Sequence, residues 1–136
     1  MKYVSTRGGV APVRFKDAVM MGLASDGGLV VPEAVPDVSA KLSTWSGLTY
    51  PELAFEVIRV FSDDINDEDL KRMTRESYAG FGRADVAPIR EVGSLQVLEL
   101  FHGPTLAFKD FALQFLGELF SHILPVSYTH LRAHET

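Results

Sequence analysis

The first 92 residues carry short apolar stripes at helical spacing, separated by turn residues. Apolar side chains recur every three or four positions over 15–23, and the turn-prone residues 26–28 then predict a sharp stop. A second stripe covers residues 53–61 and follows Pro51, a residue that suits the first turn of a helix. A third helix is expected to start at Asn66 and to stop before Gly80, with acids in its first turn, where they favour the helix dipole. This part is therefore predicted to be mainly helical.

The stretch between the first two stripes indicates a short extended run and a loop. Residues 29–32 are apolar and end in proline, which favours an extended conformation. Prolines and small polar residues punctuate the chain up to Gly47 and predict a loop. Trp45 lies in that loop and is expected to pack against the core.

The pattern changes near Val92. Residues 95–100 alternate in part between apolar and polar side chains, which predicts a strand. A glycine-containing turn comes next. It leads into a long apolar helix that we expect Thr105 to cap and that runs to Ile123. A strand, a turn and a helix form the opening of a βα unit, whose turn is where α/β sheets place ligands. We therefore predict an α+β chain with a helical segment over 1–92 and the start of an α/β domain over 93–124.

Composition and charge narrow the class of protein. Hydrophobic residues make up 46% and charged residues 23% of 136, which is typical of globular proteins. The formal net charge of -5 and the scattered basic residues argue against nucleic-acid binding. Cysteine is absent, the start lacks a signal-peptide pattern, and no apolar run has the length of a membrane span. We therefore expect a cytoplasmic protein that binds neither nucleic acid nor membrane.

Lys109 is the candidate nucleophile. If the last helix begins at Thr105, Lys109 lies in its first turn, on the side that carries Leu116 and Phe120. Burial and the positive end of the helix would both lower the pKa of its amine, and a neutral amine can attack an aldehyde. The alternative is a lysine whose stem lies on apolar surface while its charged end reaches water. Helix geometry alone leaves both interpretations open.

The histidines offer weaker candidates. His102 could contact an anionic group at the turn, or it could be a hydrogen-bonded structural residue. His130 and His134 have the spacing of two metal ligands on a helix, but Leu131 stands where the metalloprotease motif needs glutamate. We therefore expect no metal site.

Two separate stretches of the chain resemble the threonine synthase family. The first is similar to the cofactor-lysine motif of that family and reads Phe101-His102-Gly103-Pro104-Thr105-Leu106-Ala107-Phe108-Lys109-Asp110. The second is similar to the opening segment of the family and comprises Tyr3, Ser5-Thr6-Arg7-Gly8, Phe15, Ala18, Gly22-Leu23, Asp26-Gly27-Gly28-Leu29 and Pro32. The resemblance covers approximately residues 1 to 124.

The resemblance implies the amino-terminal part of a fold-type II pyridoxal 5'-phosphate enzyme. Lys109 would be both the Schiff-base lysine that binds the cofactor and the catalytic acid and base. Members of the family convert O-phospho-L-homoserine and water to L-threonine and phosphate, so this small molecule is the expected substrate. His102, Thr105 and Asp110 accompany the lysine, but the resemblance does not assign their individual roles.

The resemblance also implies that the chain is a truncated, inactive amino-terminal fragment. Family members are several times longer, and their glycine-rich phosphate-binding loop follows the lysine helix, whereas no such loop follows Lys109 here. Residues 125–136 no longer resemble the sequences of the family and are instead similar to translated vector sequence. We expect them to be a non-native tail.

Two alternatives stay open. Another fold-type II pyridoxal-phosphate lyase, such as a serine or threonine dehydratase, would use a lysine in the same way. Its relatives do not share the opening segment, which argues against it. The other alternative is a noncatalytic helical interaction module in which Lys109 only reaches from apolar surface to water.

Overall fold

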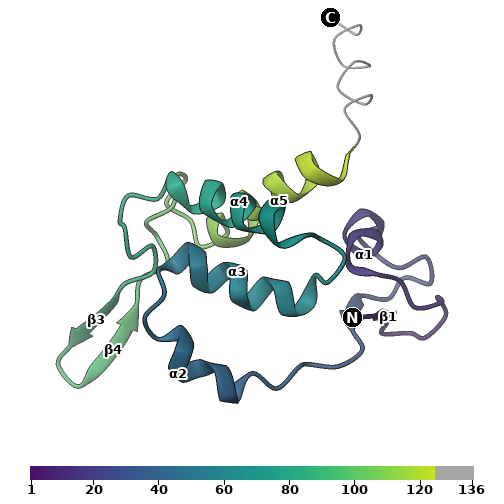
Figure 1. Cartoon of the computed structure of the whole chain (residues 1–136), viewed down its shortest axis with the longest axis horizontal. Coiled ribbons are helices and arrows are strands. Elements are labelled where there is room, and N and C mark those ends of the chain that lie inside the picture. Colours follow the sequence, from purple (N-terminus) through teal and green to yellow (C-terminus); the bar gives the residue numbers. More distant parts are fainter. Residues whose placement is uncertain (125–136) are drawn as a thin grey trace, which may run out of the picture. The chain divides into compact units, whose positions relative to one another are not determined.

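The described part of the chain, residues 1–124 of a computed structural model, mixes helices with two small antiparallel sheets (Figure 1). This confirms the predicted α+β class. Two compact units are present, one from Met1 to Arg72 and one that starts at Met73. The expected non-native tail, with His130 and His134, lies outside the described residues.

The first sheet joins the start of the chain to the predicted extended run. Strand β1 (Tyr3–Ser5) pairs antiparallel with β2 (Val30–Pro32), so that Tyr3 lies opposite Pro32. The extended run is thereby confirmed, whereas its partner β1 was not predicted. A strand of three residues has too few positions for an alternating pattern, and only its pairing with a distant segment defines it.

Helix α1 (Phe15–Met21) ends earlier than the turn at 26–28 suggested. Gly22 follows the helix with φ +68°, a backbone conformation that glycine adopts without a steric penalty. The residues at 26–28 instead close a loop, because the Asp26 carboxylate accepts hydrogen bonds from the Ser5 hydroxyl (2.7 Å) and from the amides of Gly9 (2.8 Å) and Gly28 (2.9 Å). Two pieces of the opening-segment motif thus meet at one carboxylate.

The predicted second stripe forms helix α3 (Tyr50–Phe61), which follows a short 3-10 turn η1 (Ser39–Lys41) and helix α2 (Leu42–Trp45). The start of α3 is fixed by Glu52, whose carboxylate accepts a hydrogen bond from the Thr49 amide at 2.8 Å. Phe55 lies in the core of this unit, and Trp45 is only 7% exposed, as predicted.

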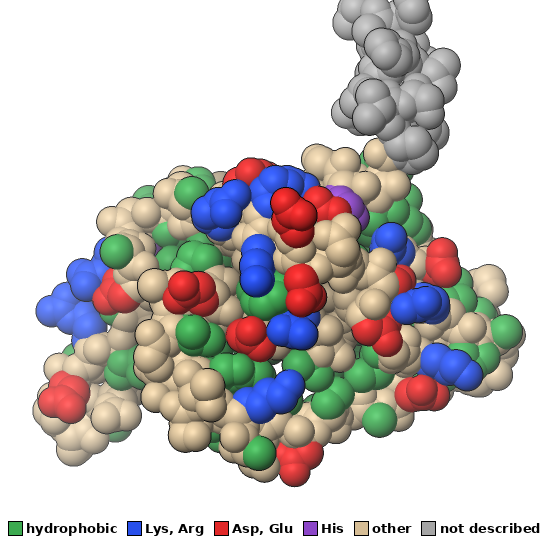
Figure 2. Space-filling model, in the orientation of Figure 1, with side chains coloured by type: hydrophobic (Ala, Val, Ile, Leu, Met, Phe, Trp, Pro, Cys, Tyr) green, Lys and Arg blue, Asp and Glu red, His purple; other side chains and the backbone are tan. Residues whose placement is uncertain are grey.

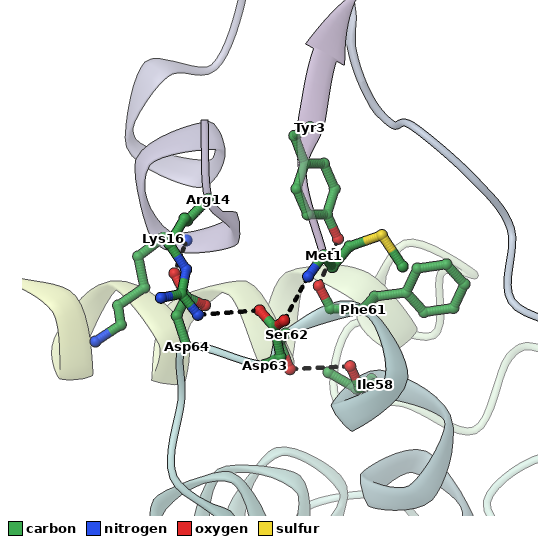
Figure 3. A network of polar contacts seen from close by, with 9 residues as sticks. All are labelled: Met1, Tyr3, Arg14, Lys16, Ile58, Phe61, Ser62, Asp63 and Asp64. Carbon is green, nitrogen blue, oxygen red and sulfur yellow. Dashed lines mark hydrogen bonds and ion pairs between the residues drawn. The ribbon is translucent and has the colours of Figure 1, made fainter. Parts of the chain in front are cut away.

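A polar network attaches the start of the chain to the end of α3 (Figure 3). The Met1 ammonium group pairs with the Asp63 carboxylate, which also accepts a hydrogen bond from Arg14 at 3.3 Å. The Tyr3 hydroxyl donates to the Phe61 carbonyl at 2.7 Å. These contacts hold β1 against the loop that follows α3.

Helix α4 (Asp67–Ala79) confirms the third predicted helix, with three acids in its first turn. Leu70 and Met73 on this helix are completely buried. The helix ends before Gly80, as expected.

The second unit contains a hairpin that the sequence pattern revealed only in part. The predicted strand is β4 (Leu95–Leu98), and it pairs antiparallel with β3 (Ile89–Val92) across a turn in which Gly93 has φ +62°. Every residue of both strands is exposed, including Ile89 and Leu95. Helix α5 (Asp110–Ile123) follows the hairpin and buries Leu119.

Acidic and basic side chains lie interspersed on the face drawn in Figure 2, in agreement with the scattered basic residues of the sequence. Within residues 1–124, none of the helices combines the length and the apolar character needed to cross a membrane.

Candidate functional site

The segment that carries Lys109 is held by the loop that follows α4. The Gly82 amide donates to the His102 carbonyl at 2.8 Å, and the Glu99 amide donates to the Pro88 carbonyl at 2.9 Å. These two backbone bonds fix residues 99–102 along the loop and set where the following turn begins.

An aromatic cluster attaches the start of α5 to the end of α4. The Phe81 ring makes edge contacts with Tyr78, at 5.5 Å between ring centroids, and with Phe111, at 5.1 Å. The Tyr78 hydroxyl also donates to the Phe111 carbonyl at 3.0 Å. The first turn of α5, which follows Lys109 directly, is therefore anchored from outside the helix.

Two consecutive turns connect Gly103 to α5. The Leu106 amide donates to the Gly103 carbonyl at 3.0 Å, and the Asp110 amide donates to the Ala107 carbonyl at 3.1 Å. Leu106 has φ +62°, a conformation that costs a residue with a side chain roughly 1–2 kcal/mol. The surrounding contacts must therefore hold Leu106 in this conformation.

Asp110 closes these turns with its side chain. Its carboxylate accepts one hydrogen bond from the Thr105 amide and one from the Thr105 hydroxyl, each 2.8 Å long, and a longer one of 3.5 Å from Gln114. The residue is only 1% exposed. Burial by itself raises the pKa of the Asp110 carboxyl, but the hydrogen bonds from Thr105 and Gln114 outweigh it and the pKa is lowered.

Gly103 is required by the position of this carboxylate. A Cβ atom at residue 103 would overlap both the carboxylate and the Cβ of Asp110. The backbone of Gly103 can approach Asp110 only because glycine has no side chain.

The start of α5 corrects the expected helix boundary. The helix begins at Asp110 instead of next to Thr105, and Thr105 bonds to the Asp110 side chain instead of capping the helix. The reason is that residues 103–109 are occupied by the two turns, which a helical pattern of apolar residues does not reveal.

Lys109 lies at the boundary between the turns and α5, with φ -62° and ψ -20°. Its side chain is exposed, which agrees with the open alternative of a lysine whose charged end reaches water and not with burial of the amine. The rotation that placed it on the apolar side of a helix assumed a continuous helix from Thr105. Within residues 1–124 no hydrogen bond or ion pair engages the Lys109 amine.

His102 lies beside the turn and pairs with an acid. Its Nε2 atom is 3.1 Å from Oε1 of Glu99, and both side chains are largely buried. This contact agrees with the hydrogen-bonded alternative for His102. Over the same 124 residues, no three side chains of the types that bind metals are grouped to hold an ion.

We assigned no role to Asp110 from the sequence, although its position among apolar residues indicated one. Asp110 interrupts an otherwise apolar run, and a charge placed among apolar side chains is costly unless it accepts hydrogen bonds. Thr105, five residues earlier, supplies two of the donors.

This fold is that of the front part of a pyridoxal-phosphate-bound enzyme of known structure. The PLP-bound threonine synthase from Brucella melitensis superposes with a TM-score of 0.87 at 42% identity, over 91% of this chain and 27% of that one. Residues 2–78 match the family described as Threonine synthase N terminus. The chain belongs to that family.

Curated relatives agree over the same region. Threonine synthase from Pseudomonas aeruginosa is 52% identical over 127 residues, which cover 91% of this chain and 27% of the relative. Threonine synthase from Schizosaccharomyces pombe is 44% identical and is matched over 25% of its length. The chain therefore spans about a quarter of the length of these relatives.

Proposed function

We propose that the protein to which this segment belongs is a threonine synthase that uses pyridoxal 5'-phosphate to convert O-phospho-L-homoserine and water to L-threonine and phosphate. The observation that carries this proposal is the 52% identity to the Pseudomonas aeruginosa enzyme. That match extends over 91% of this chain.

Lys109 is the residue that we assign to the cofactor. Its amine is primary and exposed, and no side chain within residues 1–124 pairs with it, so an aldehyde can reach it and condense with it, with loss of water. The backbone that carries it is fixed by Asp110 and by the aromatic cluster of Tyr78, Phe81 and Phe111. These features fit a covalently held pyridoxal phosphate.

When bound, the cofactor supplies an electron sink for carbanions next to the substrate nitrogen. Lys109 would then move protons at the substrate carbons, because its amine can act as an acid and a base when it is not bonded to the cofactor. In the same proposal, residues 93–124 begin the cofactor-binding domain and 1–92 form the domain before it. The 136-residue chain alone is then expected not to form threonine.

A chimera tests the proposed function. Residues 1–124 replace the matching segment of the Pseudomonas aeruginosa synthase, which supplies the remaining three quarters of the fold. We expect this chimera to release threonine and phosphate from O-phospho-L-homoserine. Lys109→Arg should abolish turnover, because a guanidinium does not form the bond to the aldehyde. Lys41→Arg is the matched control and should leave turnover unchanged.

The proposal is contradicted if the Lys109→Arg chimera forms threonine as fast as its parent. Deamination of serine or threonine by the chimera, without threonine formation from O-phospho-L-homoserine, would instead favour the dehydratase alternative.

A further inference from the structure

Asp110 has the properties of a residue that fixes a backbone. Its carboxylate is buried, and it is turned back toward Thr105, away from the solvent that its neighbour Lys109 faces. A buried carboxylate is stable only when its oxygens accept hydrogen bonds, so the position of Thr105 is tied to that of Asp110. These hydrogen bonds therefore hold both ends of the segment from Thr105 to Asp110.

The backbone between Gly103 and Asp110 has little conformational freedom. Gly103 packs so tightly against Asp110 that a side chain at residue 103 would overlap the carboxylate. Leu106 is held at φ +62°, which an unconstrained leucine would leave for a more favourable backbone conformation. Asp110, Gly103 and Leu106 together define one course for the backbone up to Lys109.

Lys109 depends on that backbone for its direction. No side chain within residues 1–124 contacts its amine through a hydrogen bond or an ion pair. The two turns and the first turn of α5 fix the position of the Lys109 Cα and the direction of its Cα–Cβ bond, from which the side chain extends.

We propose that Asp110 is a positioning residue for Lys109: by accepting the Thr105 hydrogen bonds with its carboxylate, it fixes the backbone from which the amine reaches the aldehyde carbon of pyridoxal phosphate, where a C=N bond forms and the aldehyde oxygen leaves as water. Asp110 acts through the turn and does not touch the reacting atoms. This inference rests on the proposed function, because it needs Lys109 to be the cofactor lysine.

The test uses the chimera freed of cofactor and measures two quantities. Mixing with pyridoxal phosphate gives the rate at which the lysine–cofactor bond forms, followed by visible absorbance. Thermal unfolding of the same cofactor-free samples gives stability. Asp110→Ala should slow bond formation by about 10-fold or more, since a misplaced reacting group loses much of the advantage of fixed orientation. Thr105→Val removes only the hydroxyl donor and should slow it less.

Two variants separate positioning from stability. Asp110→Asn should restore the rate to within about threefold of the parent, because the amide can accept from the Thr105 amide and donate to the Thr105 hydroxyl. Leu119→Ala removes a buried side chain from the same helix, away from the turn. It should lower the unfolding temperature and leave the rate of bond formation unchanged.

The outcomes distinguish the two proposals. If the bond forms at Lys109 and Asp110→Ala leaves its rate unchanged, the positioning role is refuted and the proposed function stands. If Leu119→Ala slows bond formation as much as Asp110→Ala, stability explains the effect and the positioning role is again refuted. Should Asp110→Ala fail to fold, a Thr105→Val rate equal to that of the parent refutes it. A cofactor bond at another lysine overturns the proposed function itself.

Discussion

Replacing Tyr3 or Tyr78 by phenylalanine removes a single hydroxyl group, and the two residues lie in different units. Each tyrosine is 7% exposed and donates its hydroxyl hydrogen to a backbone carbonyl, Tyr3 to Phe61 at 2.7 Å and Tyr78 to Phe111 at 3.0 Å. Replacement by phenylalanine keeps the ring and removes only this donor. The two carbonyls differ, and that difference predicts unequal costs.

The Phe61 carbonyl belongs to the last residue of α3, where the helix supplies no donor of its own. Leaving this part-buried acceptor without its donor costs about 2 kcal/mol, within the usual range for an unsatisfied group. The Phe111 carbonyl lies inside α5, where the helix provides a donor four residues on. Tyr78→Phe should therefore cost only about 1 kcal/mol, the net value of an ordinary hydrogen bond.

Native-state hydrogen–deuterium exchange of the 136-residue chain measures both costs. Tyr3→Phe should speed exchange of the amides around β1 and the end of α3 by about 30-fold, and Tyr78→Phe should speed exchange in the first half of α5 by about fivefold, from the free energies above. Each variant should act within its own unit. A reversed order of the two effects, or a Tyr3→Phe variant that changes α5 as strongly as β1, would contradict these unequal costs.

Three further predictions concern the same fold. Burial first, and then the charges of Asp64 and Asp63, raise the pKa of Tyr3 from 10.0 to about 12. The unfolded chain therefore loses this proton first, and the free energy of unfolding should fall as pH rises from 10 to 12; a Tyr3→Phe variant that shows the same fall contradicts this. Gly28→Ala should lower the denaturation midpoint, because its Cβ would overlap the Ser5 hydroxyl, whereas Gly47→Ala, with nothing within 4 Å, should not; equal midpoints would argue against the loop closure. Leu70→Ala should lower the free energy of unfolding by about 2–5 kcal/mol in urea titration, since Leu70 is completely buried, and a loss below about 1 kcal/mol would show that it is not in the core.

The sequence predicted elements that depend on local patterns. The stripe over 53–61 has the period of an amphipathic helix, and α3 follows it closely. Acids at the start of α4 and a glycine after its end marked its two boundaries. The capping box of Thr49 and Glu52, which fixes the start of α3, was not predicted; only Pro51 pointed to that end of the helix.

The pattern was insufficient where distant residues decide the conformation. Strands β1 and β3 are three and four residues long, and each exists through pairing with a partner strand. The pattern left the burial of Lys109 open, and it placed the residue on a continuous helix, whereas the Asp110 carboxylate and the missing side chain of Gly103 shape two turns there. A spacing rule contains no information on such contacts.

The most direct test of the account is to locate the bond between the protein and pyridoxal phosphate. The chimera that carries residues 1–124 is loaded with the cofactor, reduced with borohydride, digested and mapped by mass spectrometry. We expect one modified peptide with the label on Lys109, and loss of that label in Lys109→Arg but not in Lys41→Arg. A label on any other lysine, or a folded chimera that takes up no label, would contradict the assignment of Lys109 as the cofactor lysine.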